Sequence, residues 1–149
     1  MAQRIVVGVD GSRGASAALR FAVDEAKLRN ARLDAVLAWG LLDQPAVPPA
    51  DFNPTLDETD ARAYLERSVL EAVGEDPGVE VSLMAINDLP ARTLLDVSAG
   101  SDLLVVGSRG LGGFRGLLLG SVSQQIVHHA TCPVVVVPRP HEESDEASP

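Results

Sequence analysis

Short, nearly continuous apolar runs alternate along this chain with longer segments in which apolar residues recur every three or four positions. The run Arg4–Val9 is rich in β-branched residues, which is typical of a strand that is covered on both faces. The segment Ser12–Asn30 then places Leu19, Val23 and Ala26 at helical spacing and leaves charged residues for the outer face. The chain therefore begins with a buried strand followed by an amphipathic helix.

The same alternation continues to residue 137. Further strands are predicted at Arg32–Trp39, Val79–Ile86, Asp102–Val106 and Pro133–Val137, and further helices at Leu56–Val73, Ala91–Ala99 and Ser121–Ala130. Five strands separated by four helices predict an α/β fold, in which right-handed crossovers build a five-stranded parallel sheet with helices on both faces. In such a sheet, ligands bind at the carboxyl ends of the strands.

Two segments fall outside this alternation. Gly40–Pro54 contains four prolines, and because proline neither donates to a β-ladder nor continues a helix, we expect a mobile surface loop there. Thr55 and Glu58 have the spacing of a capping box, which predicts the next helix start at that point. Residues 140–149 are acidic and poor in apolar residues, so we expect a disordered tail after a single domain over residues 1–139.

The composition agrees with a parallel sheet in a single domain. A length of 149 residues is close to the commonest domain size. Hydrophobic residues make up 46% of the chain but aromatic residues only 3%, so the core must consist mainly of Val, Leu, Ile and Ala. Cys132 is the only cysteine, which excludes an intramolecular disulfide and favours a small buried side chain over a reactive thiol.

The net charge of −9 narrows the classes of partner, although four of the acidic residues lie in the tail. Nucleic-acid binding rests on clustered Lys and Arg, which this chain lacks, so we expect no nucleic-acid partner. No stretch approaches the roughly 20 apolar residues of a membrane helix. The start of the chain leads directly into a short Val-rich run instead of a signal-peptide core. We therefore expect a cytoplasmic protein with no membrane partner.

The candidate chemistry lies in a glycine-rich segment between the fourth predicted strand and the last predicted helix. From Leu103 the sequence reads LLVVGSRGLGGFRGLLLGSVSQQIV, which is a buried strand, a loop with six glycines and a helix that starts near Ser121. Glycines let the backbone approach a phosphate closely, and the N–H groups at a helix start attract anionic oxygens. The hydroxyls of Ser121 and Ser123 lie at that start. The loop matches neither the Walker A motif nor the dinucleotide GxGxxG motif.

The spacing Gly107-x2-Gly110-x9-Gly120-Ser121 resembles the phosphate-binding signature of the ATP-binding universal stress proteins. The resemblance covers almost the whole chain except the tail: it includes an early VGVDGS, a strand that ends at Trp39, Leu-Pro-Ala at 89–91, LLVVGSRG, LLLGSVS and CPVVVVP. It implies an adenine nucleotide α hydrolase-like architecture and a role in the stress response.

The same resemblance implies the residues of the site. Asp10, at the end of the first strand, would face the nucleotide near its adenosine part or its metal. Ala38 would offer its backbone to the adenine, and the loop with the following helix start would hold the phosphates and their Mg²⁺. The full set of expected ATP-binding residues is Asp10, Ala38, Val106, Gly107, Arg109, Gly110, Gly120, Ser121, Val122 and Ser123.

Several of these features have a plainer alternative. Asp10 is also a common turn-forming or helix-capping residue after a strand. Arg109 and Arg115 either neutralise phosphate charge or point to water. His128 and His129 are adjacent on a predicted helix, so they point about 100° apart and do not form the i, i+4 pair of helical zinc sites. For this pair we expect a place on the surface or at the helix end.

Two local patterns bear on the turns at the strand ends. The family often has a glycine shortly before the Pro-Ala pair, where this chain has Asn87 and Asp88, two residue types that tolerate the left-handed conformation. The tetrapeptide Gly11-Ser-Arg-Gly14 recurs at 107–110, again after a strand. Shared turn chemistry accounts for the recurrence without a gene duplication.

Three functions stay open at this point. The first is a binding module, in which ATP with Mg²⁺ stabilises a conformation that a partner or second subunit reads. The sequence shows no Ser-His-Asp set, metal cluster or catalytically placed Lys. The second is a slow ATPase, in which Asp10 or a loop serine orients water. The third is a nucleotide-free adaptor, although relatives of that kind tend to lack the glycine spacing seen here.

The resemblance also implies a homodimer. The predicted strand Val134–Val137 looks like an edge strand that would aggregate if it were left bare. Pairing with its copy across a two-fold axis would cover it. We therefore expect the dimer interface at this strand.

Overall fold

A computed structural model of the chain describes residues 3–40, 58–108 and 119–138. Its elements are β1 (Arg4–Gly8), α1 (Arg13–Arg29), β2 (Arg32–Trp39), α2 (Glu58–Val73), β3 (Val81–Asn87), α3 (Pro90–Ser98), β4 (Leu103–Gly107), α4 (Ser121–His129) and β5 (Val134–Val137). The predicted alternation is confirmed to within two residues at each boundary. Outside the described residues lie most of the proline-rich loop, Thr55 of the capping box, the middle of the glycine loop and the acidic tail.

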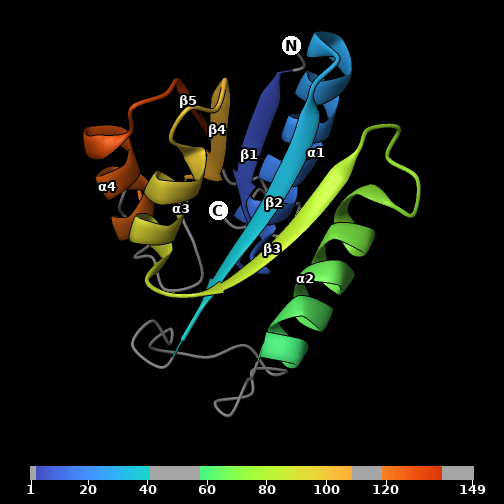
Figure 1. The fold of residues 1–149 in the computed structure, drawn as a ribbon, viewed down its shortest axis with the longest axis horizontal. Coiled ribbons are helices and arrows are strands. Elements are labelled where there is room, and N and C mark those ends of the chain that lie inside the picture. Colours follow the sequence, from blue (N-terminus) through green and yellow to red (C-terminus); the bar gives the residue numbers. More distant parts are fainter. Residues whose placement is uncertain (1–2, 41–57, 109–118, 139–149) are drawn as a thin grey trace, which may run out of the picture.

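The strands form one parallel sheet in the order β3-β2-β1-β4-β5 (Figure 1). The central strand β1 pairs with β2 on one side and with β4 on the other. The chain moves outward from β1 to β3 and then crosses back to β4, so the strand order reverses beside β1. The predicted parallel α/β fold is confirmed. Its topological switch point, where such sheets bind ligands, lies between the carboxyl ends of β1 and β4.

The two faces of the sheet bury separate apolar clusters. Ile5 and Val7 of β1 belong to the cluster under α1 and α2, whereas Val6 belongs to the cluster under α3 and α4. Both clusters consist mainly of Val, Leu, Ile and Ala, as the composition predicts. Trp39 packs half-buried against the first cluster and Cys132 against the second. Trp39 thus anchors the end of β2 to the core.

The helices end in ways that their sequences explain. α1 ends at Asn30, which takes the left-handed conformation with φ 54°. Asn30 is the only described non-glycine residue with positive φ, so Asn87 and Asp88 make their turn without that conformation. Instead, Asp88 Oδ1 accepts a hydrogen bond of 2.7 Å from the N–H of Leu89. Among the helices of the described ranges, none is long and apolar enough to cross a membrane.

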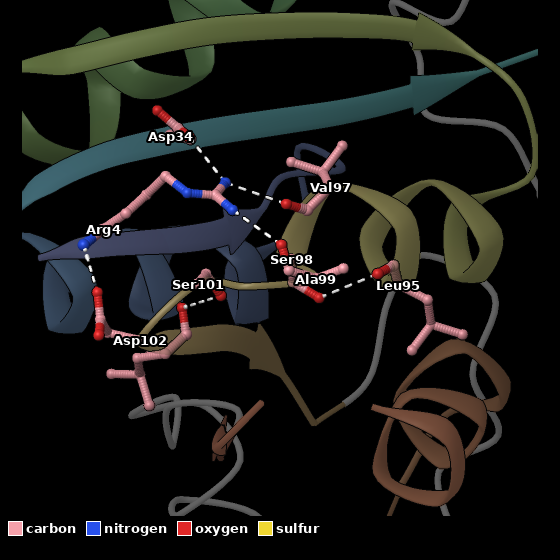
Figure 2. A network of polar contacts seen from close by, with 9 residues as sticks. Arg4, Asp34, Leu95, Val97, Ser98, Ala99, Ser101 and Asp102 are labelled. Atoms are coloured by element: carbon pink, nitrogen blue, oxygen red, sulfur yellow. Dashed lines mark hydrogen bonds and ion pairs between the residues drawn. The ribbon is translucent and has the colours of Figure 1, made fainter. Parts of the chain in front are cut away.

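Polar contacts close the amino edge of the sheet around Arg4, at the start of β1 (Figure 2). The guanidinium donates to Asp34 Oδ2 at 3.2 Å and to the carbonyls of Val97 at 3.0 Å and Ala99 at 3.2 Å. The backbone N–H of Arg4 donates to Asp102 Oδ2 at 2.8 Å. Because the two carbonyls lie at the C-terminal end of α3, Arg4 satisfies acceptors that the helix itself leaves open.

Candidate functional site

β4 ends at Gly107, which packs directly against the first turn of α1. A Cβ added at Gly107 would lie 2.8 Å from the carbonyl carbon of Gly14 and 3.0 Å from its oxygen. Backbone cannot move aside as a flexible side chain can, so only glycine fits. α1 therefore starts immediately beside the end of β4. Sequence reasoning missed Gly14, although the repeated Gly-Ser-Arg-Gly pattern marks both partners of this contact.

α4 is fastened to the same strand end by hydrogen bonds. Ser123 Oγ donates to the carbonyl of Gly107 at 2.6 Å, and the N–H of Gly120 donates to the carbonyl of Ser108 at 2.7 Å. The N–H of Ser108 donates in turn to the carbonyl of Val137 on β5. Ser123 is buried, so its hydroxyl positions α4 on β4, a role that the sequence did not indicate.

The two helix starts at this edge differ in how they are capped. At α1, Ser12 Oγ accepts a hydrogen bond of 3.1 Å from the N–H of Ala15. At α4, the N-cap position is Gly120, which makes no side-chain cap hydrogen bond. The helix then begins with Ser121, which is exposed, and Val122, which is half-buried. The amino end of α4 therefore presents N–H groups and a positive dipole end without a side-chain acceptor from its own cap.

Asp10 follows β1 at the switch point and is half-buried. Its Oδ1 accepts a hydrogen bond of 2.9 Å from the N–H of Ser12, so the turn-forming role is confirmed for that oxygen. Oδ2 makes no hydrogen bond to the described residues. The described part of the chain also holds no group of three His, Cys, Asp or Glu side chains that could bind a metal alone. One carboxylate fits an Mg²⁺ ion that is carried mainly by phosphate oxygens.

The remaining predicted residues take different places. Ala38 is half-buried in β2 and pairs with Ile86 of β3. The pairing of Gly8 with Val36, continued by two residues, puts Ala38 level with Asp10. Val106 is 4% exposed and its side chain belongs to the cluster under α3 and α4, so only its main chain can meet a ligand. Arg109, Gly110 and Arg115 lie outside the described residues.

Two other surface features, a groove and a histidine pair, lie away from the carboxyl edge of the sheet. A groove of about 250 Å³ lies between the second half of α1 and the end of α2, and the charged side chains that line it are of both signs. They are Arg20, Asp24, Lys27 and Asp76. His128 and His129 are exposed in the last turn of α4, with ring centroids 6.4 Å apart, as expected for surface residues.

The chain resembles known proteins in sequence and in fold. Residues 1–138 match the model of the Universal stress protein family. Universal stress protein Rv2005c of Mycobacterium tuberculosis is 40% identical over 132 residues, which are 89% of this chain and 44% of that protein. The chain thus spans less than half the length of this curated relative.

Solved structures of universal stress proteins have the same fold as this chain. A crystal structure of a universal stress protein in complex with cAMP superimposes with a TM-score of 0.69 at 25% identity, covering 93% of this chain and 98% of that one. The universal stress protein from Archaeoglobus fulgidus in complex with dAMP has a TM-score of 0.63 at 21% identity and covers 91% and 97% of the two chains. The second likeness bears on the fold alone.

Proposed function

This chain belongs to the universal stress protein family, and we propose that it binds ATP, with Mg²⁺ on the phosphates, at the carboxyl edge of its sheet. The observation that carries the proposal is the start of α4. Gly120 leaves that helix without a side-chain cap, and Ser123 holds it on the end of β4 at the switch point. A phosphate group would accept the hydrogen bonds that the first turn of α4 offers.

In this proposal, each part of ATP is assigned to residues at the carboxyl edge of the sheet. The phosphates bind at Gly107, Gly110 and Gly120, with the N–H groups of the first turn of α4, the Ser121 hydroxyl and the charge of Arg109. Asp10 faces the adenosine or the metal, and the main chain of Ala38 and Val106 completes the site. The solved neighbour at 25% identity binds cAMP, which combines adenine, ribose and a phosphate, and this supports a ligand of that class.

The bound nucleotide acts as a regulatory ligand. It bridges the turn after β1, the end of β4 and the start of α4, three segments that are distant in sequence. A ligand that binds only this arrangement stabilises it by mass action. A partner or second subunit then reads the stabilised conformation, and hydrolysis is not needed for the signal.

Hydrolysis is measured separately. We expect phosphate release from purified protein with excess ATP and Mg²⁺ to stay below one turnover. Many turnovers that disappear in Asp10→Ala, while ATP binding is retained, would instead establish a slow ATPase.

The second subunit is a copy of this chain, paired through β5. This strand is the last of the sheet order, and its valines, Val134–Val137, are all half-buried. They belong alternately to the two apolar clusters, so an uncovered outer edge leaves both partly open to water. We expect sedimentation to show a dimer at micromolar concentration and Val135→Glu to show a monomer. A native protein that sediments only as a monomer would contradict this pairing.

The binding site is tested by a charge placed at the start of α4. Ser121 is exposed, so Ser121→Asp should leave the fold intact while its carboxylate repels phosphate. Ser121→Asn is the neutral control of nearly the same shape. Mass analysis of nucleotide released from freshly purified protein should find an adenine nucleotide in the native protein and the control, and none in Ser121→Asp. If none of the three releases nucleotide and a titration with ATP is also silent, the protein is a nucleotide-free adaptor.

A further inference from the structure

Tyr64 of α2 reaches the turn that follows β1. The place that a Cβ would take on Gly11 is filled by the Tyr64 hydroxyl, and the ring atom Cζ lies 2.7 Å from the same point. Gly11 has φ +82°, a conformation that favours glycine. The nearby Tyr64 atoms also leave no space for a Cβ. The tyrosine therefore fills the space that this glycine leaves, next to Asp10 and the N-cap Ser12.

Two contacts orient the Tyr64 ring. It packs half-buried against the apolar cluster under α1 and α2. The guanidinium of Arg67, one turn further along α2, lies 5.4 Å from the ring centroid. These contacts restrict the ring before any ligand arrives, which lowers the entropic cost of a hydrogen bond from its hydroxyl to a ligand.

The position of Tyr64 along the carboxyl edge indicates which part of a ligand it meets. α2 contacts β2, β3 and α1, whereas α4 contacts β5 and α3 (Figure 1). A nucleotide with its phosphates at the start of α4 and its base at Ala38, near the end of β2, crosses the end of β1 between them. The middle part of a nucleotide is its sugar, and the turn at Gly11 lies at the end of β1.

We propose that Tyr64 is a specificity residue that hydrogen-bonds a hydroxyl of the nucleotide sugar beside Gly11. This inference rests on the proposed function, because it needs a nucleotide in the site. It adds a role for α2, to which neither the glycine motif nor the family resemblance assigns one. It also gives the site a means to distinguish a ribonucleotide from an analogue that lacks one sugar hydroxyl.

The test compares three ligands with the same phosphate chain: ATP, 2′-deoxy-ATP and 3′-deoxy-ATP. Their affinities are measured by calorimetry for the native protein and for Tyr64→Phe, which keeps the ring and loses only the hydroxyl. Leu70→Ala is the control, since Leu70 is an exposed residue of α2 well past the turn. We expect Tyr64→Phe to bind ATP about fivefold more weakly, as for one lost hydrogen bond. One of the two deoxy analogues should bind equally well to native protein and Tyr64→Phe.

The outcomes separate this inference from the proposed function. If Tyr64→Phe binds ATP within twofold of the native protein, or weakens all three ligands by the same factor, Tyr64 does not contact the sugar and the inference is wrong. If the native protein binds none of the three, the proposed function is wrong and the inference falls with it. Thermal unfolding of Tyr64→Phe shows that the variant is folded before binding is compared.

Discussion

The two edges of the sheet differ in how their polar groups are satisfied. At the amino edge, the chain satisfies its own polar groups: Arg4 donates to Asp34 and to the carbonyls at the end of α3, and Asp102 accepts from its backbone. At the carboxyl edge, the corresponding polar groups belong to the start of α4, whose N-cap is a glycine without a side-chain acceptor. The amino edge is held by ion pairs and hydrogen bonds within the protein, whereas the N–H groups at the start of α4 are the ones that the proposed function assigns to a phosphate.

This difference predicts that changes at the amino edge act on stability alone, whereas changes at the carboxyl edge act on stability and, under the proposed function, on ligand binding. The amino edge joins β1, β2 and the end of α3 through charged side chains, so its loss should weaken the fold without touching a ligand. The carboxyl edge is built around glycines that allow close packing: Gly107 packs against the backbone of Gly14, and Gly11 packs against the side chain of Tyr64. Changes there should affect the fold and the ligand together, unless they are confined to an exposed position such as Ser121.

The largest effect should come from Gly107→Ala. Its Cβ would meet the backbone of Gly14, which cannot move without shifting α1, so we expect a loss of about 3 kcal/mol in the free energy of unfolding. Gly8→Ala is the matched control at the end of β1. Its Cβ would meet Leu94 Cδ1 at 2.9 Å, and that flexible side chain can turn away, so the loss should be about 1 kcal/mol. Equal losses in urea denaturation would contradict the close approach of β4 and α1.

A smaller effect is expected from Arg4→Met. The substitution leaves Asp34, which is 7% exposed, without its ion-pair partner, and removes the donors at the end of α3. Because the Arg4 side chain is itself 21% exposed, we expect a loss of about 2 kcal/mol in the free energy of unfolding, which is less than for a fully buried pair.

The double variant Arg4→Met/Asp34→Leu is the control for this pair. It should regain part of that stability, since no unpaired carboxylate is then buried. If urea denaturation finds Arg4→Met as stable as the native protein, the network does not hold the amino edge.

The smallest effect is the difference in stability loss between Gly11→Ala and Gly100→Ala, which reports on the Tyr64 side chain. Gly11 and Gly100 have nearly the same φ, +82° and +80°, but a Cβ at Gly100 would meet nothing within 4 Å. Gly100→Ala should therefore lower the free energy of unfolding by about 1 kcal/mol, which is the strain of a left-handed conformation. Gly11→Ala should lower it by about 1 kcal/mol more, because its Cβ also meets Tyr64. In a Tyr64→Ala background the extra cost should vanish. If thermal unfolding shows the same difference in both backgrounds, Tyr64 does not occupy the space beside Gly11.

The sequence predicted the sheet well because a parallel sheet leaves a strong local signal. Strands buried on both faces, such as β1 and β4, are continuous apolar runs, and the helices between them carry apolar residues at helical spacing. The start of α4 was also predicted, since the change from glycine spacing to helical spacing is visible within a few residues, whereas most of the glycine loop lies outside the described residues.

Other features could not be predicted because they join residues that are distant in sequence. Arg4 meets Asp102 across 98 positions, and neither residue type indicates its partner. Gly14 and Gly107 pack together only because α1 starts beside β4. Ser123 was expected to bind phosphate through its hydroxyl, but that group donates to the carbonyl of Gly107, a choice that depends on how α4 lies on the strand.

One measurement tests the division between the two edges most directly: the stabilisation that ATP with Mg²⁺ adds to the free energy of unfolding in native protein, Arg4→Met and Ser121→Asp. At a hundred times the dissociation constant, a bound ligand adds about 2.7 kcal/mol. We expect this full increment in the native protein and in Arg4→Met, despite the lower starting stability of the latter. Ser121→Asp should be at least as stable as the native protein without ATP and gain almost nothing from it. An increment lost in Arg4→Met but kept in Ser121→Asp would contradict ATP binding at the start of α4.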